Sequence, residues 1–105
     1  MINSIEFKEL QVKDLLVDTV YQQNISKKQC EKIANNFIVN LVKPIEVALR
    51  DDGKYYILDG KHLVNVLKLK NVEKTMCRVH SGLNYEEEVK LFLAFHNPKN
   101  YSRSK

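Results

Sequence analysis

The chain has 105 residues, 44% of them hydrophobic, and a formal net charge of +4 from 17 basic and 13 acidic side chains. This length supports a single domain with one modest core and excludes a catalytic domain joined to a separate recognition domain. No apolar run is long enough to span a membrane, and the first residues lack a signal-peptide pattern, so we expect a cytoplasmic protein with no membrane partner. The interspersed charges permit nucleic-acid binding without requiring it.

Apolar residues from Ile5 to Val12 indicate an opening strand with an irregularity. The next segment, residues 15–18, is typical of a turn and leads to a polar loop that carries Tyr21 and Gln22. A tyrosine in such a loop is more often a partly buried anchor than a ligand contact.

Ser26 carries the signature of a helix start, because Gln29 follows it at capping-box spacing. The apolar residues that follow repeat at helical spacing and comprise Cys30, Ile33, Ala34 and Phe37. Cys30 and Cys77 are far apart, belong to no CxxC pair and fall at apolar positions. We therefore expect two buried thiols, with neither a disulfide nor a structural zinc ion.

A β-hairpin is predicted next, because residues 45–49 alternate apolar and polar side chains and residues 51–53 form a turn before residues 55–58. This second strand passes directly into a helix that is expected to end near Asn71. The buried face of that helix is predicted from the spacing of Leu63, Val66 and Leu67.

One more strand is predicted over residues 76–79, followed by a helix that Asn84 caps and Pro98 stops. Residues 86–88 are three glutamates, which suit the positive end of that helix as partners of its dipole better than they suit a catalytic role. His96 continues the apolar stripe of the same helix. The element order predicts a small α+β domain over residues 1–98 with a polar tail over residues 99–105.

The passage from strand to helix at Asp59 and Gly60 carries the strongest functional signal. A helix start has unpartnered backbone N–H groups and the positive end of the dipole, and Lys61 and His62 add a cation and a hydrogen-bond donor. These features suit a phosphate, although an ordinary turn can use the same residue types. We expect Asp59 to be the N-cap and not a metal ligand, because no second acid lies near it.

Several segments together resemble the N-terminal domain of the ParB and sulfiredoxin superfamily, including its short members from phages and mobile elements. They are residues 5–12, Tyr21 with Gln22, and residues 42–47, 56–62 and 87–97. The resemblance implies an α+β fold in which three main helices pack on a mixed sheet of about four strands. It also implies that the junction contacts the phosphates of a nucleotide, CTP in partition proteins and ATP in sulfiredoxins, with Mg²⁺ as the accompanying ion.

The resemblance further implies a set of phosphate- or nucleotide-binding residues. These are Asp59, Gly60, Lys61, His62, Lys43, Tyr21, Gln22 and Asn97. Sulfiredoxins look like Gly-Cys-His-Arg at the junction, and partition proteins look like Gly-Glu-Arg-Arg. This chain has Lys61, His62 and Leu63 after the glycine, which argues against sulfiredoxin activity and against CTP hydrolysis.

We therefore expect a module that binds a nucleotide or nucleic acid at the junction without strong catalysis and that requires no resident cofactor or metal. Two alternatives stay open. One is a degenerate nuclease or nucleoside triphosphatase that uses His62 and Asp59, since these are the acid and base nearest the junction. The other is a protein-interaction module with a vestigial pocket. A protein partner or a homodimer is compatible with each reading.

Overall fold

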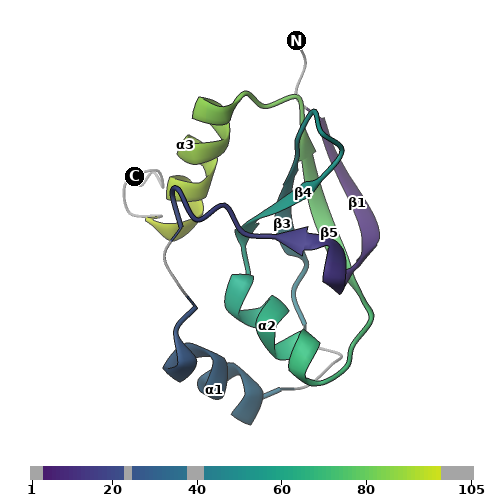
Figure 1. Cartoon of the computed structure of the whole chain (residues 1–105), viewed down its shortest axis with the longest axis vertical. Helices are drawn as coiled ribbons and strands as arrows, with labels where there is room; N and C mark the ends of the chain where they lie inside the picture. Colours follow the sequence, from purple (N-terminus) through teal and green to yellow (C-terminus); the bar gives the residue numbers. More distant parts are fainter. Residues whose placement is uncertain (1–3, 23–24, 38–41, 98–105) are drawn as a thin grey trace, which may run out of the picture.

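The computed structural model describes residues 4–22, 25–37 and 42–97, and within them one mixed five-stranded sheet is accompanied by three α-helices, the first of which packs against the second (Figure 1). The strands are β1 (Ser4–Gln11), β2 (Leu15–Leu16), β3 (Ile45–Leu49), β4 (Tyr55–Asp59) and β5 (Lys74–Ser81). The helices are α1 (Lys27–Asn35), α2 (Lys61–Leu69) and α3 (Tyr85–His96), and a short 3-10 helix spans Val12–Asp14. The α+β class and the three main helices are thus confirmed. The expected tail lies outside the described residues, as does Pro98.

The sheet has the strand order β1-β5-β3-β4-β2, with antiparallel pairs β1/β5 and β3/β4 and parallel pairs β3/β5 and β2/β4. The predicted turn over residues 15–18 is wrong in its first half, because Leu15 and Leu16 pair with Tyr55 and Tyr56. A strand of two residues has no local pattern, and this one exists because β4 offers a free edge. The sheet therefore has five strands where about four were expected.

The hydrophobic core lies between α2 and one face of the sheet. Its fully buried members come from the strands and from α2, and they include Ile45, Val47, Ile57, Val64, Leu67, Cys77 and Val79. Burying one such side chain stabilises the fold by about 1.5–3 kcal/mol. Both cysteines are free and buried, as expected, and burial raises the pKa of the Cys77 thiol to about 11. In these ranges no helix combines the length and apolar character needed to cross a membrane.

Two of the three helices begin with the side-chain caps that the sequence predicts. Ser26 Oγ accepts a hydrogen bond from the Gln29 N–H at 3.3 Å at the start of α1. Asn84 and Glu87 form a reciprocal capping box at the start of α3, with distances of 2.8 and 2.9 Å. These contacts are local, so the sequence pattern suffices to predict them.

The Arg50 guanidinium ties α3 to the sheet and to the loop after β2. It bonds both carboxylate oxygens of Glu88, at 3.0 and 2.6 Å, and Asp18 Oδ2 at 2.5 Å. The hydroxyl of Tyr21 donates a further 2.6 Å hydrogen bond to Glu88, and the guanidinium lies 3.6 Å from the ring centroid of Tyr56. The hydrogen bonds that Arg50 donates to Glu88 and Asp18 raise its pKa above the ordinary value. We call Arg50, Asp18, Glu88 and Tyr21 the Arg50 cluster.

Glu88 does more than interact with the dipole of its helix, the role expected for the three glutamates, because its carboxylate binds Arg50. Glu88 is 2% exposed, while Glu86 and Glu87 are exposed. Glu88 lies four residues before Phe92, on the same side of α3, so helical geometry carries it inward toward Arg50.

Gly60 allows β4 to pass into α2 without an intervening loop. Its φ of +109° lies in the left-handed region, and a Cβ at this position would stand 2.9 Å from Ile45 Cδ1. Gly60 itself is the N-cap residue of α2, and its carbonyl accepts the Val64 N–H at 2.8 Å. The expectation that Asp59 would be the N-cap is therefore wrong, because Asp59 is the last residue of β4.

Replacing Glu88 with Gln should lower the free energy of unfolding by about 2–4 kcal/mol, because it leaves a largely buried guanidinium without its bidentate partner. Glu86→Gln is the matched control, since it makes the same chemical change at an exposed position of the same helical turn. It should cost no more than about 1 kcal/mol. Urea unfolding monitored by circular dichroism measures both values, and equal losses would contradict the structural role of Glu88.

Gly60→Ala should destabilise the protein by about 2–4 kcal/mol, because it combines a left-handed backbone with a clash against a buried side chain. Gly53→Ala separates the two causes. Gly53 also has positive φ, +81°, but no atom lies within 4 Å of its would-be Cβ. That variant should lose about 1–2 kcal/mol in the same unfolding measurement. A Gly60→Ala loss no greater than that of Gly53→Ala would show that Ile45 does not constrain the junction.

Candidate functional site

The starts of α1 and α2 meet at His62. The backbone N–H of Ser26, the N-cap of α1, donates a 2.9 Å hydrogen bond to His62 Nε2 in the first turn of α2. Cys30 Sγ lies 3.9 Å from the His62 carbonyl oxygen and accepts a 3.4 Å hydrogen bond from Asn65 Nδ2. The two helices run side by side, and their positive ends therefore face the same region of the molecule (Figure 1). We call Gly60, Lys61, His62 and Ser26 the junction site.

The charges at these two helix starts are uniformly basic. Neither α1 nor α2 has an acid in its first turn, whereas α3 has three. Lys27 and Lys28 begin α1, and Lys61 begins α2. Gly60 has no side chain and so provides no side-chain cap for α2, unlike the N-cap residues of the other two helices. Partial burial lowers the pKa of Lys61 below its ordinary value.

The His62 ring is held in its neutral form. Because Nε2 accepts the Ser26 N–H, the ring proton of the neutral form is assigned to Nδ1. Burial lowers the pKa of His62 below its ordinary value, and the nearby positive charges of Lys61 and His96 act in the same direction. His62 is therefore a structural link between the helices whose Nδ1–H is a hydrogen-bond donor.

Asp59 borders the junction site from the end of β4. Its carboxylate is half exposed and lies 3.9 Å from His96 Nε2. Burial raises the pKa of Asp59, with Glu46 adding to the increase, while His96 and Lys43 act against it. Lys43, whose positive charge lowers the pKa of Asp59, is itself exposed.

Three more of the residues predicted to bind phosphate make contacts away from the junction site. Tyr21 belongs to the Arg50 cluster and packs against Phe92, with ring centroids 4.9 Å apart. The Gln22 side-chain amide is buried and donates to the Ile57 carbonyl oxygen, which fastens the loop to β4. Asn97 ends α3, where its backbone N–H donates to the Leu93 carbonyl at 2.7 Å. These contacts support the fold around the junction without directing the side chains to Gly60.

The sequence pattern does not predict that two further residues, Ser26 and His96, lie at or beside the junction site. Ser26 is recognisable as a cap, but its N–H reaches His62 only through the packing of two helices that are separate in sequence. His96 lies on the inward stripe of α3, and its Nε2 is 3.0 Å from the Leu58 carbonyl oxygen. The spacing of His96 after Phe92 is the signal that could have placed it near the end of β4.

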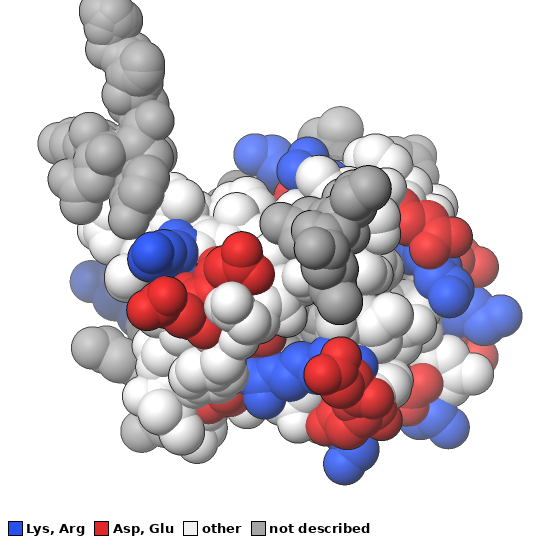
Figure 2. Space-filling view, turned by 90° about the horizontal axis from the view of Figure 1, so that it is seen from above, with Lys and Arg blue, Asp and Glu red and all other residues white. Residues whose placement is uncertain are grey.

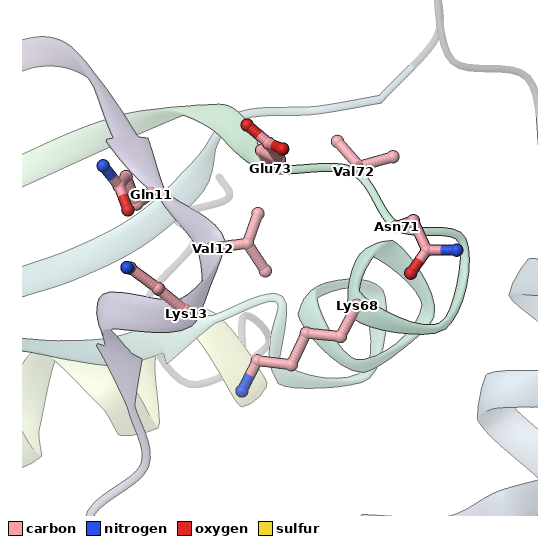
Figure 3. Close-up of a pocket in the computed structure, with 7 residues that line it drawn as sticks. All are labelled: Gln11, Val12, Lys13, Lys68, Asn71, Val72 and Glu73. Carbon is pink, nitrogen blue, oxygen red and sulfur yellow. The ribbon is translucent and has the colours of Figure 1, made fainter.

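Depressions of the surface lie beside the junction site and at the far end of α2. The far depression has a volume of about 470 Å³, and Figure 3 shows its lining residues Gln11, Val12, Lys13, Lys68, Asn71, Val72 and Glu73. A second, of about 310 Å³, lies between α1 and α2 and is lined by residues that include Ile25, Cys30 and Leu69. Neither includes Gly60, Lys61 or His62, which are partly buried, so a ligand at the junction would rest on the helix starts and outside these two depressions.

The arrangement of side chains gives less support to a metal site, or to a surface that follows a nucleic-acid backbone, than to a phosphate site at the junction. Within the described ranges, no group of three or more His, Cys, Asp or Glu residues could hold a metal ion. On the face seen in Figure 2, basic and acidic side chains are interspersed. That face therefore offers no continuous basic patch that could follow a nucleic-acid backbone.

Comparison with solved structures places the fold among partition proteins and sulfiredoxins. The chromosome-partitioning protein ParB from Caulobacter crescentus, complexed with CTP-gamma-S, aligns with a TM-score of 0.72 and 15% identity over 95% of this chain and 55% of that chain. The same protein complexed to the centromeric parS site aligns with a TM-score of 0.60 and 14% identity, covering 82% and 44%. Sulfiredoxin from Arabidopsis thaliana gives 0.62 and 18%, covering 84% and 97%. These likenesses show a ParB/sulfiredoxin-like fold.

The chain spans about half the length of the partition protein that it matches. No curated protein matches it in sequence. A family model matches residues 17–100, a segment that includes β3, β4, the junction site and all three helices. The chain therefore belongs to the family of unknown function designated DUF6551.

Proposed function

We propose that this protein is a ParB-like phosphate-binding module that binds a nucleotide, or a phosphate of a nucleic acid, at the junction site. Gly60 sets the direction in which α2 leaves β4, the first-turn N–H groups of α2 donate to a phosphate, and Lys61 supplies the charge. His62 contributes its Nδ1–H. A nucleotide would bring Mg²⁺ with its phosphates, and Asp59 is the carboxylate that borders the junction site.

The observation that carries the proposal is the convergence of two positive helix ends that lack acids, joined by the Ser26–His62 hydrogen bond. A side-chain cap and three acidic residues already satisfy the start of α3. The starts of α1 and α2 have lysines and no acid in the first turn, and α2 also lacks the side-chain cap that Ser26 gives α1, which favours an anionic ligand. The complex of a similar fold with a CTP analogue supports a nucleotide as that ligand, and the complex with centromeric DNA supports a nucleic acid.

The geometry favours binding over catalysis at this site. A histidine that is to act as a general base needs a free ring nitrogen, and His62 Nε2 already accepts the Ser26 N–H. Asp59 Oδ1 lies 3.9 Å from His96 Nε2, so the histidine that it meets is not His62. The degenerate nuclease or triphosphatase that the sequence left open would therefore need a different acid and base.

Calorimetric titration with CTP, ATP and GTP in the presence of magnesium should give saturable binding to at least one nucleotide. Lys61→Ala should weaken that binding about tenfold or more, because it removes a charge-assisted phosphate contact. Lys68→Ala is the matched control, since it removes the same charge from the last turn of α2 and should leave affinity unchanged. Equal effects of the two variants, or no heat with any nucleotide, would contradict a nucleotide site at the junction.

The neutral His62 predicts a specific pH dependence of stability. Its pKa in the folded state is lower than the value of about 6.5 in the unfolded chain, so the unfolded state binds more protons between the two values. Stability should therefore fall as the pH drops through about 6.5, and the loss should level off below the folded-state pKa. His62→Gln keeps an acceptor for the Ser26 N–H but cannot titrate.

Thermal unfolding of the protein and of His62→Gln at a series of pH values from neutral to mildly acidic measures this effect. The variant should lose less stability than the unaltered chain over that interval, and the difference isolates His62 from the other titrating groups. Parallel curves for the two proteins would contradict the neutral, hydrogen-bonded ring.

A further inference from the structure

Strand β1 leaves one edge of the sheet open. It pairs with β5 on one side only, and in the part of the chain that the structure describes no strand pairs with its other side (Figure 1). Seven of its eight residues are exposed. An edge of this length has alternate N–H and C=O groups directed outward, and these groups can pair with another strand.

The face of the sheet beside this edge carries exposed apolar side chains. Ile5 and Phe7 are 56% and 63% exposed, and Met76 on β5 is 46% exposed. The β1/β5 register places Ile5 opposite His80, Phe7 opposite Arg78 and Glu9 opposite Met76, so these side chains share one face. An open strand edge next to an apolar surface is suited to a strand that continues the same sheet.

The charges along β1 are self-complementary in one antiparallel register. When two copies pair with Phe7 opposite Phe7, each Glu6 faces Lys8 of the other copy, and each Ile5 faces Glu9 of the other copy. Sliding the copies by one step that keeps the same face places Glu6 opposite Glu6 or Lys8 opposite Lys8. Like charges directly opposite are destabilising, so the charge pattern selects the register centred on Phe7.

We propose that two copies of this chain associate through their β1 strands, antiparallel and centred on Phe7, and form one continuous sheet. The two Phe7 rings then meet on the apolar face, flanked by Ile5 from each copy. Charged residues of a single sign on an edge strand commonly prevent it from pairing with another copy. Here Glu6 and Lys8 have opposite signs, so they attract each other across the interface and favour pairing. The junction site is not part of this interface, so the association is independent of phosphate binding.

Sedimentation equilibrium over a wide concentration series tests this interface with three variants. Lys8→Glu places Glu6 opposite a glutamate twice in the symmetric pair and should weaken dimerisation roughly tenfold or more. The double variant Glu6→Lys with Lys8→Glu restores opposite charges across the interface and should restore the dimer. Lys54→Glu makes the same charge change in the hairpin between β3 and β4 and should leave the association unchanged.

Circular dichroism of each variant establishes that it is folded before its mass is compared. Amide hydrogen exchange then reports on the edge itself, because the outward-directed amides of β1 should become protected as the concentration rises. A protein that remains monomeric throughout the series overturns the proposal. So does a Lys8→Glu variant that dimerises as tightly as the unaltered chain, or a Lys54→Glu variant that weakens as much as Lys8→Glu.

Discussion

Ile45 fills the space in which a side chain at position 60 would stand, and much of the molecule is arranged around that contact. Because residue 60 is glycine with a left-handed backbone, β4 ends and α2 begins at consecutive positions. This passage sets the direction of α2 across the core and places Lys61 and His62 just beyond the carboxyl end of β4. His62 then fixes α1 through the Ser26 N–H, so the position of two helices follows from one close backbone approach.

The three helices differ in the charges at their N-terminal ends, and the difference follows from the groups that lie beside each end. α3 begins over the Arg50 cluster, where Glu88 neutralises a guanidinium and the capping box satisfies the first N–H groups. α1 and α2 begin next to each other with lysines and a neutral imidazole. Asp59 is the acid that borders them, and its raised pKa reflects partial burial beside Glu46. An anionic ligand would offset the repulsion that two adjacent positive helix ends create.

Sequence reasoning succeeds here wherever the determining contact is local. The caps at Ser26 and Asn84, the hairpin before Tyr55 and the burial of Cys30, Val66 and Leu67 each follow from spacing within a few residues. It fails where a partner lies far along the chain. β2 forms because β4 has a free edge, and Glu88 is buried because it binds Arg50. Residue 60 is the N-cap of α2 and must be glycine, because Ile45 leaves no room for a Cβ. Local pattern and resemblance suffice to predict a phosphate site at the junction. The Ser26–His62 hydrogen bond cannot be predicted in this way, because it forms only when α1 packs against α2.

The measurement that tests the phosphate-binding account most directly is a titration of isotope-labelled protein with CTP and magnesium, followed through backbone amide chemical shifts. The account predicts that the amides of Lys61, His62 and Leu63 shift together with those of Lys27 and Lys28, along one saturating curve. Those residues come from two helix starts that are adjacent only in the folded molecule. Shifts confined to the depression at the far end of α2, or an unchanged spectrum at saturating nucleotide, would contradict it.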